Sequence, residues 1–346
     1  MILRGPGDVM HYRKTEAREW ALQNMVGCAN TTIPSFSSDL RKLNESAIRH
    51  DIRRAMELGF TGTLLCSEVN VTHDEYRQFV EWSSDEAAGR LQLVFHAAFN
   101  TLEENIEMAQ IARDAGAHYT LLSYPANFRP ASMAQVYDYT RAFCDHTALG
   151  VMLFPVPLWN FGRLHPADID IDTLDRMVQD CANVVAIKAE GGRSVGGIVE
   201  VHRRFSGRVV VSCPLEKDII PLMQYMRFRY SGTSSFEYYG DTVPRMFSLA
   251  VAGDHEAAMK IYWQISAARA ANAATNAYVA HTLFINRALW KYKGWLNGMN
   301  GGPLRQPTMK VSERDMNMLR RAVIESGIAN PAEPNDQYFV GRHPLQ

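Results

Sequence analysis

Residues 183–189 read NVVAIKA, an apolar run that ends in Lys188 and Ala189. A short run rich in β-branched residues is typical of a parallel strand that is buried on both faces. Runs of the same kind recur along the chain, so the sequence predicts a series of buried strands. They are MVGCANT (25–31), GTLLCS (62–67), LQLVFHA (91–97), HYTLLSY (118–124), GVMLFPV (150–156), RVVVSC (208–213) and RYSGTSS (229–235).

Segments with helical spacing lie between these runs, for example NESAIRHDIRRAMELGF (44–60) and TLEENIEMAQIARDAGA (101–117). Both begin with a residue that can cap a helix, and both contain a glycine near their end. Eight strand–helix units in order favour a parallel barrel over an open sheet. We therefore predict an α/β protein, a (β/α)8 TIM barrel over residues 25–240 with a C-terminal helical extension.

Three further segments flank the predicted barrel. Residues 1–24 form an N-terminal extension, and residues 241–328 have helical spacing, which predicts C-terminal helices packed on the barrel. The tail, 329–346, is rich in Pro, Asn and Asp, and we expect it to be extended or loosely ordered.

Composition argues against several classes of protein. The net charge is −1 with both signs interspersed, so no basic stripe predicts nucleic-acid binding. No apolar run reaches the length of a membrane span, and the N-terminal stretch is charged and lacks a signal-peptide core. We expect a cytoplasmic protein with no membrane contact and no nucleic-acid partner.

The five cysteines are odd in number and form no CxxC pair, which is typical of buried reduced thiols. Cys66 and Cys213 fall near predicted strand ends, so a catalytic cysteine at either position is the alternative.

Lys188 is the clearest candidate for a chemically reactive side chain. Active sites of barrels lie at the carboxyl ends of the strands, where Lys188 falls. Burial lowers the pKa of an ammonium group, and the neutral amine can attack a ketone to form an imine. The alternative from position alone is a structural lysine paired with Glu190 or Glu216.

The chain resembles the dihydrodipicolinate synthase / N-acetylneuraminate lyase family of class I aldolases over roughly residues 25–328. In that family the sixth strand ends in the imine-forming lysine, followed by Glu or Asp. The resemblance implies a Schiff base at Lys188, a small 2-oxo acid substrate such as pyruvate, and a homo-oligomer, either a dimer or a tetramer. The segments that carry it are VVAIKAEGG (184–192), VMLFPVP (151–157), TTIPSF (31–36), EVNVTHDEYRQFVEW (68–82) and GGPLRQPTMKVSERDMNMLRRAVIESG (301–327).

The chain also departs from the family's pattern. The fifth strand of the family carries a tyrosine that shuttles protons, and here the matching residue is Phe154. The loop after the second strand lacks the paired threonines that hold the substrate carboxylate, although Ser67 and Glu68 remain as candidates for binding substrate. Leu158 and Trp159 replace the arginine that the synthases place after the fifth strand, which predicts negligible synthase activity and a less polar substrate arm.

Other side chains at strand ends are candidates for the missing functions. His96 and Tyr124 are our candidates for catalytic proton transfer, because both fall where a strand ends. Ser212 and Ser234 are candidates for binding a carboxylate or a hydroxyl group, and Phe154 and Trp159 for contacting the substrate. No zinc or nucleotide motif is present, so we expect neither a metal nor a cofactor.

Taken together, these features predict a Schiff-base lyase of the aldolase or hydratase-aldolase type that acts on pyruvate or another 2-oxo acid. A dehydratase that uses the same imine is one alternative. A non-catalytic barrel that binds a keto acid is another, although an idle buried lysine at position 188 would cost stability.

Overall fold

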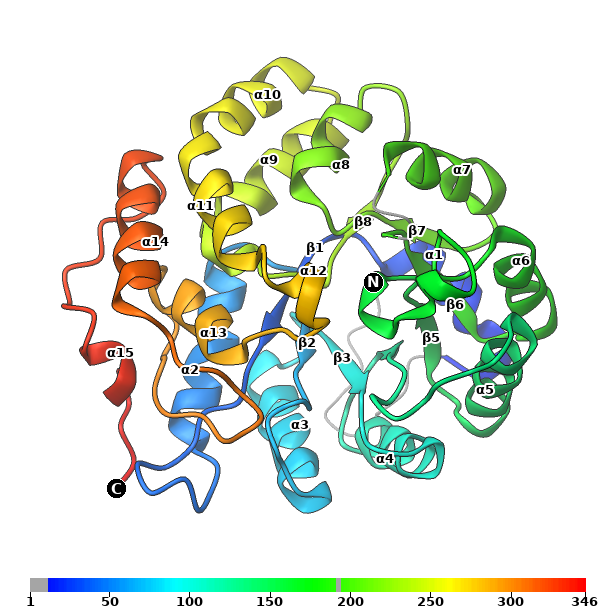
Figure 1. The fold of residues 1–346 in the computed structure, drawn as a ribbon, viewed down its shortest axis with the longest axis horizontal. Coiled ribbons are helices and arrows are strands. Elements are labelled where there is room, and N and C mark those ends of the chain that lie inside the picture. The colour runs from blue at the N-terminus through cyan, green and yellow to red at the C-terminus, as the bar shows by residue number, and fades with distance from the viewer. Residues whose placement is uncertain (1–11, 191–193) are drawn as a thin grey trace.

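The computed structural model describes residues 12–190 and 194–346, and its eight strands form one parallel sheet that curls into a barrel (Figure 1). The order of the strands around the sheet is β7-β6-β5-β4-β3-β2-β1-β8. This arrangement confirms the predicted TIM barrel. The strands are β1 (Gly27–Thr32), β2 (Gly62–Leu65), β3 (Gln92–Ala97), β4 (Tyr119–Leu122), β5 (Gly150–Leu153), β6 (Val184–Lys188), β7 (Val210–Ser212) and β8 (Tyr230–Ser231).

A helix follows every strand and covers the outside of the barrel (Figure 1). Asn44, Thr72 and Thr101 each accept a hydrogen bond from a backbone N–H in the first turn of such a helix, which is why these helices begin where they do. The helices are α2 (Glu45–Glu57), α3 (His73–Ala87), α4 (Leu102–Asp114), α5 (Met133–His146), α6 (Ile171–Asp180), α7 (Val195–Phe205), α8 (Glu216–Leu222) and α9 (Thr242–Val251).

The barrel closes differently on the two sides of β8. Backbone pairing joins β8 to β1, with Gly27 opposite Tyr230. On the other side, serine side chains connect β7 and β8. Ser212 Oγ donates to the carbonyl oxygen of Gly232 over 3.0 Å, and Ser231 Oγ donates to that of Cys213 over 2.7 Å. Because Lys188 is the register partner of Ser212, it lies one strand away from this seam.

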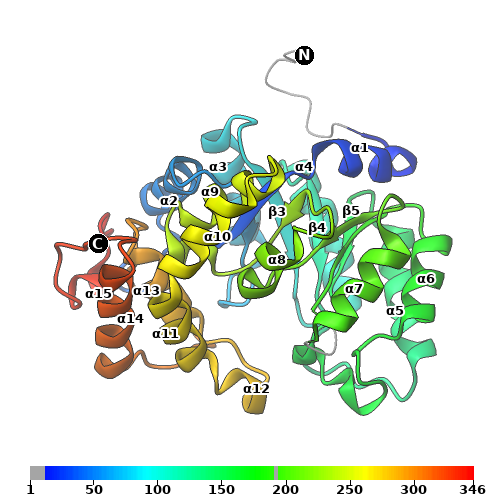
Figure 2. The ribbon, with the colours of Figure 1, turned by 90° about the horizontal axis from the view of Figure 1, so that it is seen from above.

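The floor of the barrel is apolar and is covered by the chain that precedes β1. Helix α1 (Ala17–Asn24) packs against β5 and β6, and Trp20 contacts Tyr119. Inside the barrel, the hydroxyl groups of Tyr119 and Tyr230 hydrogen-bond to each other over 2.8 Å. The described part of the predicted N-terminal extension therefore plugs the barrel at the end away from α12 (Val279–Thr282) (Figure 2).

The segment after α9 adds helices beside the barrel and at its mouth (Figure 2). Helix α14 (Glu313–Glu325) packs against α11 (Ser266–Asn276), so the added helices form a layer of their own. The others, besides α12, are α10 (His255–Gln264), α13 (Arg287–Trp295) and α15 (Gln337–Val340).

The sequence predicts an extended or loosely ordered tail, but part of it, α15, is helical and held against the rest of the protein. Tyr338, in α15, is buried, and its hydroxyl donates to the carbonyl oxygen of Ala288 over 2.6 Å. The tail is therefore tied to α13 by a buried aromatic side chain.

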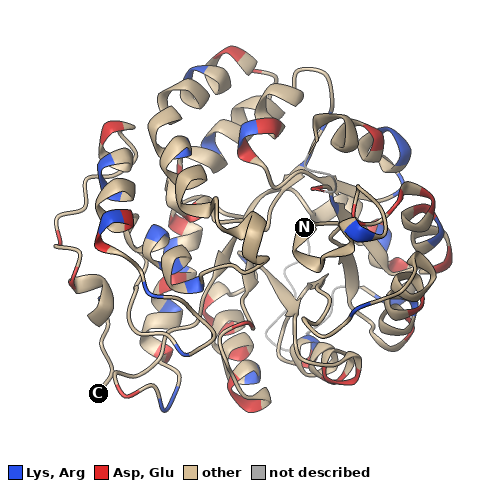
Figure 3. Cartoon of the chain, in the orientation of Figure 1, with Lys and Arg blue, Asp and Glu red and all other residues tan. Residues whose placement is uncertain are grey.

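Acidic and basic residues are mixed along the outer helices (Figure 3). Within the described part of the chain, no helix has both the length and the apolar character needed to cross a membrane. The homo-oligomer implied by the family resemblance stays a prediction.

Candidate active site

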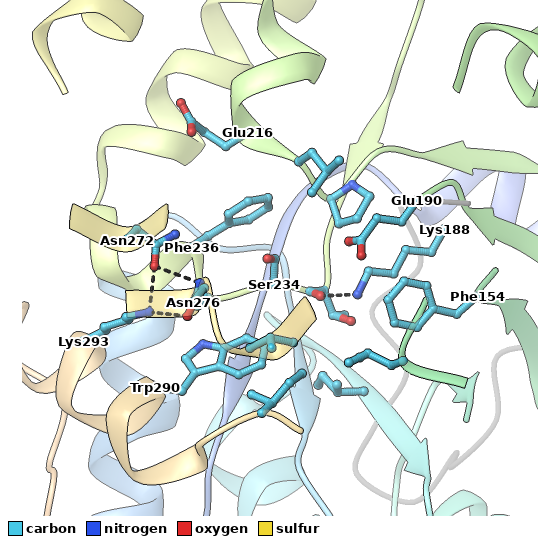
Figure 4. A pocket seen from close by; sticks show the side chains of 18 of the residues that line it. Phe154, Lys188, Glu190, Glu216, Ser234, Phe236, Asn272, Asn276, Trp290 and Lys293 are labelled. Atoms are coloured by element: carbon cyan, nitrogen blue, oxygen red, sulfur yellow. Dashed lines mark hydrogen bonds between the residues drawn. The ribbon is translucent and has the colours of Figure 1, made fainter. Parts of the chain in front are cut away.

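Lys188 ends β6 with its side chain buried at the mouth of the barrel, only 5% of the residue being exposed. Its Nζ donates a hydrogen bond of 2.5 Å to the carbonyl oxygen of Thr233. The same Nζ lies 3.8 Å from the centre of the Phe154 ring (Figure 4). The amine is therefore held by a neutral acceptor and an aromatic face.

Burial lowers the pKa of Lys188 to about 8, because removing an ammonium group from water disfavours its charged form. The carboxylate of Glu190 opposes this shift, and the guanidinium of Arg287 adds to it. The neutral amine is thus far more abundant near neutral pH than it would be for an exposed lysine, although the protonated form still predominates. The neutral form is the state in which an amine is a nucleophile.

The amine opens into a cavity of about 380 Å³, a volume within the usual range for small-molecule sites. Two parts of the fold line it. Strand ends of the barrel supply one wall, and α11 and α13 of the C-terminal segment supply another. Among the residues predicted from the sequence, the lining includes Glu68, His96, Phe154, Trp159, Lys188 and Ser234.

His96 lines the cavity with both ring nitrogens engaged. Its Nδ1 accepts from the backbone N–H of Ser67 over 3.4 Å, so its Nε2 carries the proton and donates to Ser123 Oγ over 3.1 Å. Burial, together with the positive charges of Arg287 and Lys188, lowers the pKa of His96 to about 4, while Glu68 opposes the shift. His96 is therefore neutral at physiological pH and orients the Ser123 hydroxyl.

Tyr124 does not line the cavity. Its hydroxyl hydrogen-bonds Thr140 Oγ1 over 2.6 Å, and Thr140 belongs to α5 on the outside of the barrel. Its ring packs against Phe128 and Phe161. The hypothesis of proton transfer by Tyr124 is not retained, because its hydroxyl is engaged outside the cavity.

Two predicted serines serve the scaffold. Ser67 Oγ donates to the carbonyl oxygen of His96 over 3.0 Å. Ser212 Oγ exchanges hydrogen bonds with the backbone of Gly232 and holds the seam between β7 and β8. Neither is among the residues that line the cavity, so we no longer assign substrate contacts to them.

Glu68 has a partner that the sequence did not reveal. The guanidinium of Arg287, from α13, pairs with its carboxylate inside the cavity. Burial alone would raise the pKa of Glu68, but the positive charge of Arg287 and the hydrogen bond from its guanidinium lower it. The pair links the second barrel strand to the C-terminal helices.

Glu68 also belongs to a group with Cys66 and His96 whose potential metal-ligand atoms lie within 4.8 Å of one another. We assign no metal to this group, because the guanidinium of Arg287 already pairs with Glu68 and would repel a cation. Burial raises the pKa of Cys66, and raises that of Cys213 to about 12, which disfavours the thiolate at either candidate cysteine.

Glu190, named from the sequence only as a structural partner of Lys188, lies in the cavity itself. The structure places its carboxylate in the cavity beside Lys188 (Figure 4). Ser123 and Thr233 were missed as well, although both follow strands. The lining residues from α11 and α13 could not have been predicted in this way, because their local sequence does not show that these helices face the cavity.

A comparison with protein families agrees with this geometry. The model of the dihydrodipicolinate synthetase family matches residues 35–326, and the chain belongs to this family.

Individual relatives are distant. A 4-hydroxy-tetrahydrodipicolinate synthase of Bradyrhizobium diazoefficiens is 26% identical over 298 residues, which cover 83% of this chain and 93% of that protein. The same enzyme of Methylacidiphilum fumariolicum has a similar structure, with a TM-score of 0.73 at 17% identity, over 88% of this chain and 96% of that one. An N-acetylneuraminate lyase of Fusobacterium nucleatum gives a TM-score of 0.70 at 15% identity, over 87% and 98% of the two chains. At these identities the structural matches establish the fold alone.

We predict that His96 makes stability depend on pH. The unfolded chain takes up a proton at a histidine below about pH 6.5, whereas the folded protein resists protonation of His96 until about pH 4. The contribution of His96 to the free energy of unfolding is therefore fully present above pH 6.5, and it declines as the pH falls toward 4. The decline should amount to roughly 1–3 kcal/mol.

Urea denaturation at a series of pH values measures this effect. A His96→Asn variant should give a flatter curve than the parent between pH 6.5 and 4, and subtracting the two curves removes the contribution of the other titrating groups. Parallel curves would contradict the prediction.

Proposed function

We propose that this protein is a lyase that forms a Schiff base between Lys188 and the ketone of a 2-oxo acid, and then cleaves a carbon–carbon bond of the substrate. The observation that carries the proposal is the Lys188 amine itself. It is desolvated at a strand end, lies in a cavity of suitable size and has a pKa lowered to about 8. Membership of a family in which the resemblance implies an imine-forming lysine at this position supports the assignment.

The chemistry follows from the neutral amine. Its nitrogen adds to the ketone carbon, and the carbinolamine expels its hydroxyl group as water to leave a protonated imine. The imine accepts the electron pair of the bond that breaks between carbons 3 and 4, while a base removes the proton of the hydroxyl group on carbon 4. An aldehyde leaves, and the remaining enamine is protonated and hydrolysed to pyruvate and the free lysine.

These proton transfers need a group within hydrogen-bond reach, and Phe154 cannot supply one. We propose that Glu190 does so. Its carboxylate lies on the same wall as Lys188 and acts on the charge of the amine (Figure 4). The Ser123 hydroxyl, which His96 orients, is a second hydrogen-bonding group at the cavity surface.

Next to the imine, the substrate would meet the aromatic side chains of Phe154 and Trp159. Phe154 and Trp159 contact each other edge to face, and Trp159 Nε1 donates to the carbonyl oxygen of Phe154 over 2.6 Å. This contact holds Trp159 at the position where the resemblance implies an arginine in the synthases. We therefore propose a substrate other than that of the synthases named among the relatives.

The first experiment traps the imine. The protein is incubated with pyruvate, reduced with borohydride, digested and analysed by mass spectrometry. The adduct should lie on the peptide that contains Lys188, and a Lys188→Met variant should give none. An adduct on another lysine, or no adduct on the parent protein, would refute the proposed mechanism.

A second prediction concerns Glu190. Replacing Glu190 with Gln removes a negative charge that raises the pKa of Lys188, so the pH at which trapping becomes half-maximal should fall below that of the parent. Turnover of a substrate, once one is known, should fall by roughly 100- to 10,000-fold. Initial trapping rates between about pH 6 and pH 10, a range that brackets the amine's titration, give the profile.

Glu216→Gln is the matched control, because Glu216 lines the same cavity but pairs with Arg269. Its profile should coincide with that of the parent. A Glu190→Gln profile that also coincides with the parent would remove Glu190 from the proposed role.

A third prediction is that synthase activity is negligible, since Phe154, Leu158 and Trp159 stand where the resemblance implies polar residues. A coupled assay with pyruvate and aspartate semialdehyde tests this. Turnover in the ordinary enzymatic range, on the order of 1–1000 per second, would show that these replacements do not decide the substrate.

A further inference from the structure

Helix α13 presents a polar and aromatic face to the cavity. Arg287, Trp290 and Lys293 all line the cavity. Because they are spaced three residues apart, they lie along the same side of the helix. Figure 4 shows Lys293 on the opposite side of the pocket from Lys188. The cavity thus has a second amine, remote from the proposed nucleophile.

The Lys293 amine is held by amide groups. Its Nζ donates to Asn272 Oδ1 over 2.7 Å and to Asn276 Oδ1 over 2.9 Å, and both asparagines belong to α11 (Figure 4). Asn272 in turn donates from Nδ2 to the hydroxyl of Tyr239 over 3.2 Å, which keeps its oxygen turned to the amine. An ammonium group has three donors, so one remains for a ligand.

The charge of Lys293 is not balanced by a contacting carboxylate. Only 2% of the residue is exposed, and within residues 12–190 and 194–346 it takes part in no ion pair. Burial lowers its pKa to about 7, against the opposing influence of Glu237 and Asp315. Burial also raises the pKa of Glu237, which weakens the counter-charge that this nearby carboxyl can offer. A buried cation without a counter-ion is costly, and a bound anion would remove that cost.

Arg287 adds donors on the same face of α13. One of its terminal nitrogens pairs with Glu68, but its Nε and Nη1 are buried and have no hydrogen-bond partner in the described structure. Buried donors of a guanidinium group are rarely left unsatisfied in a protein. Arg287 as a residue lines the cavity, so a small rotation of its guanidinium would bring these donors to a ligand.

We propose that the Arg287–Trp290–Lys293 face is a second anion subsite, and that the substrate is a 2-oxo acid with a second carboxylate at the end remote from its ketone. The inference rests on the proposed function, since Lys188 holds the ketone end. Lys293 binds the remote carboxylate, with the unpaired nitrogens of Arg287 beside it. Asn272 and Asn276 hold the amine without neutralising it, so that the substrate provides the counter-charge.

The test compares pyruvate with 2-oxoglutarate and 2-oxoadipate, which carry a second carboxylate on arms of different length. The measured quantity is the concentration that half-saturates borohydride trapping at Lys188. For at least one dicarboxylic acid this concentration should lie roughly tenfold or more below that of pyruvate, as a charge-assisted hydrogen bond of ordinary strength would give. Lys293→Met should abolish this preference.

Two variants make the comparison specific. Lys217→Met removes an exposed lysine that lines the same cavity but not this face, and it should keep the preference of the parent. Asn276→Asp places a carboxylate against the Lys293 amine at an exposed position, and it should abolish the preference even where Lys293→Met fails to fold.

The preference should also depend on pH. It is expected to be greatest below about pH 7, where Lys293 holds its proton, and to decline above that pH as the amine becomes neutral. Because pyruvate and the dicarboxylic acids both react with Lys188, their ratio cancels the titration of that amine. A structural role of Lys293 would not move this ratio.

Failure of this inference can be told from failure of the proposed function. If neither pyruvate nor a dicarboxylic acid is trapped at Lys188, the Schiff-base proposal has failed, and calorimetry with glutarate on the parent and Lys293→Met then tests the subsite alone. If pyruvate is trapped but neither dicarboxylic acid is preferred, or if Lys293→Met keeps the preference, the second subsite is refuted.

Discussion

Desolvation of one amine is the constraint on which the proposed chemistry depends. Lys188 ends a strand whose other residues are apolar, and it meets a carbonyl oxygen and an aromatic ring where an ion pair would have kept it charged. Its pKa falls to about 8 for that reason. The junction between β7 and β8 positions the carbonyl oxygen that accepts the hydrogen bond from Lys188. Serine side chains on β7 and β8 tie the end of β8 to the barrel, and the carbonyl of Thr233, just beyond β8, reaches the amine.

The same alternation of side chains that builds the barrel decides which strand-end residues reach the cavity. In β4 and the residues just after it, Leu121 and Ser123 point into the barrel and line the cavity. Tyr124, one residue further on, points to the other side and packs outward against α5. Lys188, the last residue of β6, and Glu190, two residues later, both line the cavity. A prediction that followed the alternation of inward and outward side chains along the strand would have chosen Ser123 over Tyr124. The fold followed from the apolar runs, but the strand-end candidates were chosen by chemical type, and chemical type does not determine direction.

The alternation of side chains along strands cannot predict which residues of the helices reach the cavity. Arg287 and Lys293 come from a helix far beyond β6 in the sequence. Their spacing shows that they share a helical face, but it does not show what that face covers. That depends on how α13 packs against the tail and the rest of the C-terminal segment, as through the hydrogen bond from Tyr338 to the backbone of Ala288. Such packing is a tertiary property with no local signature in the sequence.

The hydrogen-bond partners of three cations in the cavity, Arg269, Lys188 and Lys293, distinguish their roles. Arg269 is paired with Glu216, a carboxylate that already balances its charge, so this pair suits a fixed structural contact. Lys188 and Lys293 are held by uncharged oxygens, which orient an amine without fixing its proton. An amine held in this way can lose its proton to react, as we propose for Lys188, or keep it when an anion arrives, as we propose for Lys293. Since both amines share one cavity, a substrate that spans them must bring a ketone to one end and a negative charge to the other.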